Sequence, residues 1–284
     1  MSKKTQLLKY LIYFAKKIFC ILTIKEDKTC ILPYKKLKSK IIINIITKIM
    51  VTTTKRVVLS NYLEKIEKLE NSFTKNGIYI HKGNILTKHL LYNFIDYISK
   101  AIKQEAYMQE VFILINNTNR LDKNNIIYLA KQFKRLNVVT KNINSFKKLE
   151  TYLEEELGIA ITITNNKRKS LLKAKIIVNI DFDEEMLNSF NINNKAIIIQ
   201  MNHIQVRSKL FSGINILDYE ITYKKDIFSE RMYNKFNKKI LYESLIYSKN
   251  YDSIVKKIQE DDVKIINLIG KNGVINEAEY KYYC

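Results

Sequence analysis

A polar turn in the middle of the chain joins an apolar strand to a helix, and its side chains are of kinds that bind anions. The run VFILI is followed by the residues Asn116, Asn117, Thr118, Asn119 and Arg120, and then by a helical pattern. Backbone amides at a helix N-terminus attract phosphate, and Asn, Thr and Arg side chains can add hydrogen bonds to it. The same residues equally suit a helix cap that binds nothing, and we favour this plainer interpretation.

This turn contains no glycine. In dinucleotide-binding sheets, glycines at this position let the backbone approach the pyrophosphate and let the helix pack close to the strand. Asn tolerates the left-handed backbone conformation that such turns use, but its side chain prevents the same close approach. The missing glycines therefore count against ordinary dinucleotide chemistry and leave at most an altered anion site.

More polar side chains follow the later strands, at the edge where open parallel sheets bind their ligands. Thr140, Lys141 and Asn142 end the second strand of this section, and the run 167–169 (KRK) follows the third. A basic rim for an anionic ligand could be formed by Lys141, Lys167, Arg168 and Lys169, although a solvated charge run is the commoner explanation.

Two segments resemble the cofactor half of shikimate dehydrogenase and glutamyl-tRNA reductase: LNVVTKN (136–142) and KAKIIVNIDF (173–182). The resemblance implies that Thr140, Lys141 and Asn142 contact the phosphate on the adenosine ribose of NADP, with Lys141 in place of the families' Arg. It also implies that Asn179 lies beside the nicotinamide. Lys175 replaces the acidic residue of the second motif, and the families' catalytic residues have no counterpart here. The cofactor is therefore left open, with NADP as the candidate.

Several other chemistries are disfavoured by the motifs that the sequence lacks. There is no GxxxxGK[ST] loop, no HExxH pair and no CxxC spacing, and Cys20, Cys30 and Cys284 are far apart. The acids at 181 and 183–185 could hold a divalent cation, but acidic residues also favour a helix N-terminus, so we expect no metal site. The cysteine usage predicts a cytoplasmic protein without a disulfide framework.

The elements that must position these residues alternate between apolar runs and helical patterns. Five candidate strands lie at 111–117, 136–142, 161–166, 175–182 and 196–201. Continuous apolar strands of this kind are typical of a parallel sheet covered on both faces. The predicted fold is α/β, with an open, mostly parallel Rossmann-like sheet preceded by a smaller α/β section.

The predicted organisation has three sections. An N-terminal α/β section at 1–105 begins with a hairpin of 18–24 and 29–34, a Rossmann-like domain follows at 106–225, and a C-terminal segment at 226–284 is helical. The turn GKNG near the C-terminus predicts a last hairpin.

The formal charge of +21 would attract polyanions. Lysines outnumber arginines and are spread over the whole chain, so a dedicated nucleic-acid function is disfavoured. Residues 6–24 predict an amphipathic helix that either packs on the domain or lies on an anionic membrane, and packing is favoured.

Two functional hypotheses follow. The first is a non-catalytic Rossmann-like protein that binds an anionic small molecule or a protein partner. The alternative is an NADP-dependent oxidoreductase related to shikimate dehydrogenase. In the oxidoreductase, the amides of the 116–120 turn converge on an open crevice beside Lys141, whereas in the non-catalytic protein side chains fill that crevice. The oligomeric state is left open.

Overall fold

The computed structural model describes residues 22–24, 29–31, 40–53, 55–117, 119–201, 204, 211–224, 228–247 and 250–281. The chain divides into two compact units, Met1–Leu86 with Lys224–Asn250 and Thr87–Tyr223 with Tyr251–Cys284. The predicted sections 1–105, 106–225 and 226–284 are each continuous in sequence, whereas both units consist of two stretches. The helix predicted over residues 6–24 lies outside the described residues except for its last three positions, which form a strand, β1 (Leu22–Ile24), rather than a helix.

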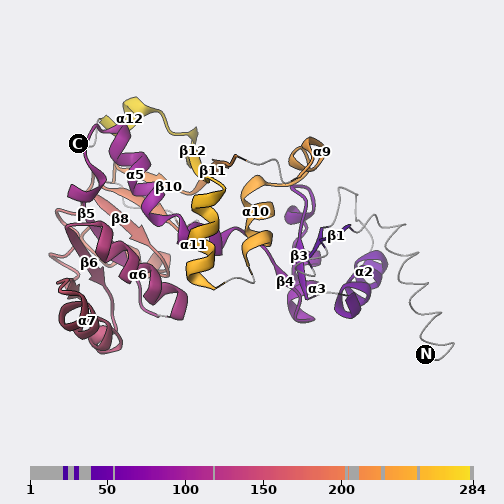
Figure 1. Ribbon diagram of the computed structural model, residues 1–284, viewed down its shortest axis with the longest axis horizontal. Helices are drawn as coiled ribbons and strands as arrows, with labels where there is room; N and C mark the ends of the chain where they lie inside the picture. The colour runs from indigo at the N-terminus through magenta and orange to yellow at the C-terminus, as the bar shows by residue number, and fades with distance from the viewer. Residues whose placement is uncertain are drawn as a thin grey trace. The chain divides into compact units, whose positions relative to one another are not determined.

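The second unit contains a six-stranded sheet in which every neighbouring pair is parallel (Figure 1). Its strands are β5 (Glu110–Leu114), β6 (Arg135–Val139), β7 (Thr162–Thr164), β8 (Ile176–Asn179), β9 (Ile197–Gln200) and β10 (Ile214–Ile216). The spatial order is β7-β6-β5-β8-β9-β10. This is the Rossmann order, in which the chain reverses direction across the sheet between its first and fourth strands, here β5 and β8. The predicted fold class is confirmed.

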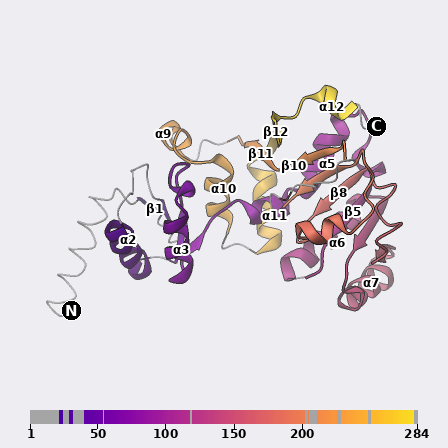
Figure 2. The ribbon, with the colours of Figure 1, turned by 180° about the vertical axis from the view of Figure 1, so that it is seen from behind.

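Both faces of this sheet are buried at β5, β8 and β9, which explains why these strands contain unbroken apolar runs. Phe112, Leu114 and Ile177 belong to a core beneath helix α8 (Glu184–Asn188), while Val111 and Ile113 are buried on the opposite face. The other helices of the unit, seen from two sides in Figures 1 and 2, are α5 (Leu91–Ala101), α6 (Arg120–Gln132), α7 (Ile143–Leu157), α11 (Tyr251–Glu260) and α12 (Glu277–Lys281).

Residues 168–173, between β7 and β8, form a series of turns. The side-chain oxygen of Asn166 accepts hydrogen bonds from the backbone amides of Arg168 and Lys169, both at 3.1 Å. A side chain that binds nearby amides in this way favours a turn over a regular helix.

A separate antiparallel sheet completes the second unit. It contains β11 (Asp218–Thr222), β12 (Lys264–Gly270) and β13 (Gly273–Val274), in that order. The predicted terminal hairpin is confirmed as β12 and β13, and Gly273 has a φ of 110° that a side chain would disfavour.

The first unit has its own four-stranded sheet, in which β1 (Leu22–Ile24) and β2 (Thr29–Ile31) form the predicted antiparallel hairpin. β3 (Arg56–Val58) and β4 (Tyr79–Ile80) extend it in parallel. Its helices are α2 (Lys40–Thr53), α3 (Glu67–Lys75), α9 (Glu230–Tyr233) and α10 (Lys238–Ile246), and the short α4 (Asn84–His89) spans the division between the units. Among the described residues, no helix is long and apolar enough to cross a membrane.

Candidate functional site

The carboxyl edge of the six-stranded sheet brings three of the polar turns together. Leu114 of β5 pairs with Val139 of β6 on one side and with Asn179 of β8 on the other. The turns that follow these three strands therefore leave the sheet at the same level. This is the point where ligands bind in open α/β sheets.

A carboxylate occupies the backbone amides of the turn after β5. The two side-chain oxygens of Asp181 accept hydrogen bonds from the amides of Asn116, at 2.7 Å, and Asn117, at 2.8 Å. Charge-assisted hydrogen bonds of this kind are about twice as strong as neutral ones. The chain's own acid thus stands where amides of this turn would otherwise donate to a bound phosphate.

Hydrogen bonds also join the turns after β5 and β6. The side-chain oxygen of Asn116 accepts from the amide of Lys141 at 2.9 Å, and its carbonyl accepts from the side chain of Asn142 at 3.3 Å. Thr140 is fully buried, and its hydroxyl oxygen accepts from the amide of Asn142 at 3.0 Å. These residues lie together, as expected for one site, but their polar groups bind one another.

The end of the turn caps the following helix. The side-chain oxygen of Asn119 accepts from the amide of Asp122 at 2.9 Å, which satisfies one of the free amides at the start of α6. This is the geometry of the helix-cap interpretation. Thr118 lies outside the described residues.

Asn179 is fully buried and does not face the open edge. Its side-chain oxygen accepts from the amide of Phe182 at 2.9 Å, and its nitrogen donates to the carbonyl of Phe182 at 3.1 Å and to Gln200 Oε1 at 2.8 Å. These bonds fix the turn that carries Asp181. Asn179 therefore positions the acid rather than offering its own amide to a ligand.

Four cations lie around this closed edge with exposed side chains: Lys141, Lys167, Arg168 and Lys169. On the acidic side, Asp183 accepts from the amide of Met186 at 2.7 Å and so caps α8. Among the described residues, no three His, Cys, Asp or Glu side chains are grouped closely enough to hold a metal ion.

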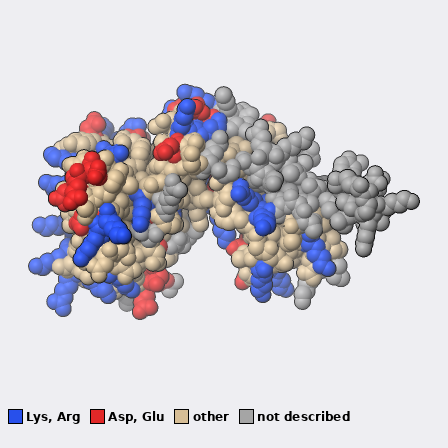
Figure 3. Space-filling model, turned by 60° about the horizontal axis from the view of Figure 1, so that its bottom comes forward, with Lys and Arg blue, Asp and Glu red and all other residues tan. Residues whose placement is uncertain are grey.

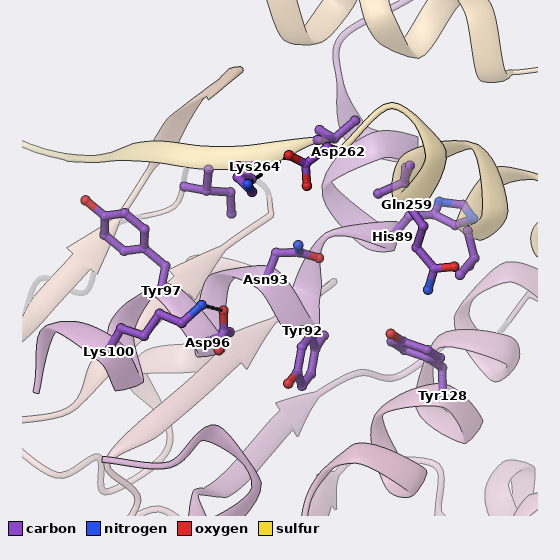
Figure 4. A pocket seen from close by; sticks show the side chains of 14 residues that line it. His89, Tyr92, Asn93, Asp96, Tyr97, Lys100, Tyr128, Gln259, Asp262 and Lys264 are labelled. Atoms are coloured by element: carbon purple, nitrogen blue, oxygen red, sulfur yellow. Dashed lines mark hydrogen bonds and ion pairs between the residues drawn. The ribbon is translucent and has the colours of Figure 1, made fainter. Parts of the chain in front are cut away.

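A separate pocket of about 480 Å³ lies in the second unit, against α5, α6, α11 and the start of β12 (Figure 4). Its polar lining comes mainly from one face of α5, where Tyr92 and Asp96, and likewise Asn93 and Tyr97, are one helical turn apart. The remaining lining residues include His89, Lys100, Tyr128, Val255, Ile258, Gln259, Asp262, Val263, Lys264 and Ile265.

Burial changes the ionisation of the phenols in this pocket. Burial, with a smaller contribution from Tyr92, raises the pKa of Tyr128 above its usual value. Burial also raises the pKa of Tyr97, and the charge of Glu277 adds to the effect. Both phenols are therefore neutral hydrogen-bonding groups over the whole physiological range.

The first unit contains a third polar constellation, which is closed. His81 and Glu243 are both fully buried, with Nδ1 and Oε1 3.3 Å apart. Glu243 Oε2 accepts from the amides of Ile85, at 2.7 Å, and Leu86, at 3.1 Å, and so caps the start of α4. The arrangement ties α10 to α4 within the unit and offers a ligand no exposed group.

Sequence reasoning missed the pocket and the role of Asp181. Asp181 was considered only as a cation ligand, because its partners are 64 and 65 residues away in sequence. The polar stripe on α5 was the available signal for the pocket, since Asn93, Asp96, Tyr97 and Lys100 follow the helical repeat.

No family model and no curated protein match the chain. Among solved structures, the A chain of dipicolinate synthase from Bacillus subtilis is 13% identical with a TM-score of 0.33, over 59% of this chain and 55% of that one. L-tryptophan dehydrogenase from Nostoc punctiforme is 8% identical with a TM-score of 0.36, over 78% and 63%. Aspartate transcarbamoylase from Trypanosoma cruzi is 11% identical with a TM-score of 0.26, over 60% and 61%.

The chain therefore spans about three-fifths of the length of these proteins. They are a synthase, a dehydrogenase and a carbamoyl-transfer enzyme, so the likeness does not select a reaction. The Rossmann-like assignment rests on the strand order.

Proposed function

We propose that the chain is a non-catalytic Rossmann-like protein that binds an anionic ligand at the basic rim of its sheet. The basic rim consists of Lys141, Lys167, Arg168 and Lys169. The observation that carries the proposal is the pair of hydrogen bonds from the amides of Asn116 and Asn117 to Asp181. A protein that used this turn for a dinucleotide would leave those amides free.

A pyrophosphate that reached the same amides would have to displace the carboxylate of Asp181 from two hydrogen bonds. It would also lie against the negative charge of Asp181. Both amides are in half-buried or exposed positions, so water replaces the carboxylate in part, and the two bonds together contribute about 1–2 kcal/mol. Their loss lowers the affinity by roughly one power of ten.

The rim itself stays available to an anion. Its four side chains are exposed, and they follow β6 and β7, on the side of the sheet away from Asp181 in the strand order. Figure 3 shows Lys and Arg spread over several places on one face and interleaved with Asp and Glu, which does not favour a nucleic-acid surface. A small anion or an acidic segment of a protein partner suits four cations better than a long polyanion does.

The alternative is an NADP-dependent oxidoreductase related to shikimate dehydrogenase. The observation that favours it is the exposed ammonium of Lys141, placed directly after β6, where a ribose 2′-phosphate binds in such sheets. This alternative requires Asp181 to leave the amides when the cofactor binds.

A thermal-shift panel separates the two hypotheses, because a ligand of the native fold raises the melting temperature. We expect citrate or pyrophosphate to stabilise the protein and NADPH and NADH to add no more than these simple anions do. Replacing the four rim cations by Gln should remove the anion shift. The matched control should retain the anion shift. It replaces four exposed cations elsewhere in the unit by Gln, namely Lys131, Lys134, Arg135 and Lys148.

Two results would overturn the proposal. One is an NADPH shift well above that of pyrophosphate which disappears in Lys141→Ala, because that result supports the oxidoreductase. The other is an anion shift that falls equally in the rim variant and in its control, because the effect would then be one of net charge.

A further inference from the structure

The pocket on α5 lies outside the carboxyl edge, and none of the groups in the proposed rim lines it. Its volume of about 480 Å³ lies within the range of cavities that hold small molecules. The lining comes from three separate stretches of the second unit, residues 89–100, Tyr128 and 255–265. A ligand in this pocket would therefore be independent of the function proposed for the rim.

The walls of the pocket suit a flat ring. Tyr92 and Tyr128 meet edge to face, with ring centroids 6.4 Å apart and an angle of 84° between the rings. Behind them the surface is aliphatic, and it is formed by the buried side chains of Ile258, Val263 and Ile265. Aromatic side chains and an apolar floor bind planar heterocycles by stacking and edge contacts.

The charges in the pocket are already paired. Lys100 donates to Asp96 at 2.6 Å, and Lys264 lies 2.8 Å from the carboxylate of Asp262. Each acid is thereby matched by a lysine at the wall. A charged ligand would have to compete with one of these pairs, whereas an uncharged one would not.

Two carboxamides provide hydrogen-bonding groups without charge. Asn93 projects from α5 and Gln259 from α11, and Figure 4 shows the amide of Gln259 pointing toward the ring of Tyr128. A carboxamide presents a donor beside an acceptor, so it matches a ring edge on which a donor and an acceptor are adjacent. Asn and Gln use this geometry to bind nucleobases.

We propose that this pocket binds an uncharged planar heterocycle with adjacent hydrogen-bond donor and acceptor atoms, the chemistry of a nucleobase or its nucleoside. The ring lies against Tyr92 and Tyr128, and its edge is bound by Asn93 and Gln259. The paired charges of Asp96 with Lys100 and of Asp262 with Lys264 select against a phosphate at this position.

The test measures binding of adenosine, guanosine, cytidine and uridine to the full chain by saturation-transfer NMR and calorimetry, with ribose as the ring-free probe. We expect at least one nucleoside to saturate the protein, and ribose not to bind. Asn93→Leu and Tyr128→Ala should each raise the dissociation constant tenfold or more. Tyr128→Phe keeps the ring and should stay within about threefold of the parent.

The matched control is Asn144→Leu, the same substitution at an exposed position on α7, and it should bind as the parent does. The melting temperature of each variant shows whether it is folded, and Tyr128→Phe keeps the test valid if Tyr128→Ala does not fold. The proposal fails if no nucleoside saturates the protein at 10 mM, or if Asn93→Leu binds unchanged. It also fails if only phosphorylated nucleotides bind and the rim variant abolishes their binding.

Discussion

The carboxyl edge of the sheet and the pocket on α5 carry similar polar side chains, but they use them in opposite ways. At the edge, Asn116, Asn179 and Asp181 bind neighbouring parts of the chain. In the pocket, Asn93 and Gln259 project from two helices into a cavity. A position in the fold therefore identifies a possible site. Which polar groups a ligand can use depends on whether those groups already have hydrogen-bond partners within the chain.

The closed constellation in the first unit follows the same rule as the edge. Glu243 and Asp181 each accept two backbone amides, which in both cases belong to residues adjacent in sequence. Glu243 is fully buried, and Lys239, one turn earlier on α10, packs its side chain against Gly83. Gly83 has a φ of +86°, and an added Cβ would lie 3.3 Å from Cε of Lys239, so glycine is required there.

The largest effect expected from this comparison is that of Asn179→Leu. The substitution removes a hydrogen-bond partner from three buried groups, namely the amide and carbonyl of Phe182 and Oε1 of Gln200. Because each unsatisfied buried group costs about 1–3 kcal/mol, we expect a loss of about 3–5 kcal/mol in the free energy of unfolding. Urea denaturation measures it. A loss below about 1 kcal/mol would mean that the edge is not held by this network.

The next effect is that of Asp181→Ala, which frees the amides of Asn116 and Asn117. Both amides lie in half-buried or exposed positions, so water can replace the carboxylate in part, and we expect a loss of about 1–2 kcal/mol. The variant should also gain a thermal shift with pyrophosphate beyond that of the parent, because a nest of free amides binds anions. Asp181→Asn keeps one acceptor oxygen, so its stability and its thermal shift with pyrophosphate should lie between those of the parent and those of Asp181→Ala. An unchanged anion response in Asp181→Ala would show that Asp181 does not close a site.

The sequence could predict the sheet because its signal is local. β5, β8 and β9 each contain an unbroken apolar run, and both faces of the sheet are covered there, so the run alone identifies the strand. Asn119 was equally accessible, since a polar residue before a helical pattern predicts a cap.

The roles of Asp181 and the pocket residues could not be predicted in the same way. The bonds of Asp181 depend on the register that sets Leu114 opposite Asn179, and a shift of one residue would turn the carboxylate to the other face. The pocket requires α5 and α11 to lie together although about 150 residues separate them in the chain. The polar stripe on α5 can be read from the sequence, but no single stretch shows that α11 lies beside it or that Asp181 reaches the turn after β5.

A smaller effect is expected at high pH, where the pocket tyrosines ionise. Because burial raises the pKa of Tyr128 in the folded state, the unfolded chain loses its phenolic proton first as the pH rises past about 10. The contribution of the neutral Tyr128 phenol to the free energy of unfolding is therefore fully present below pH 10. It declines as the pH rises toward the pKa of the phenol in the folded state. We expect Tyr128→Phe to lose stability less steeply than the parent between pH 9.5 and about 11, with Tyr152→Phe, half-exposed on α7, as the control. Equal slopes for the parent and Tyr128→Phe would show that the phenol is not shielded from water.

The smallest effect on stability is expected at Asn93, although the substitution is the same one that is severe at Asn179. Asn93 is half-buried at the wall of a cavity, so leucine there leaves no buried partner unsatisfied and adds apolar surface beside Ile258 and Val263. Surface substitutions of this kind change stability by no more than about 0.5 kcal/mol. The two Asn→Leu variants should therefore differ by about 2.5 kcal/mol or more in the free energy of unfolding measured by urea denaturation. If Asn93→Leu were as destabilising as Asn179→Leu, the carboxamide of Asn93 would stabilise the unit by binding other groups of the chain. It would then not be available to a ligand, as is the case for the polar groups at the edge.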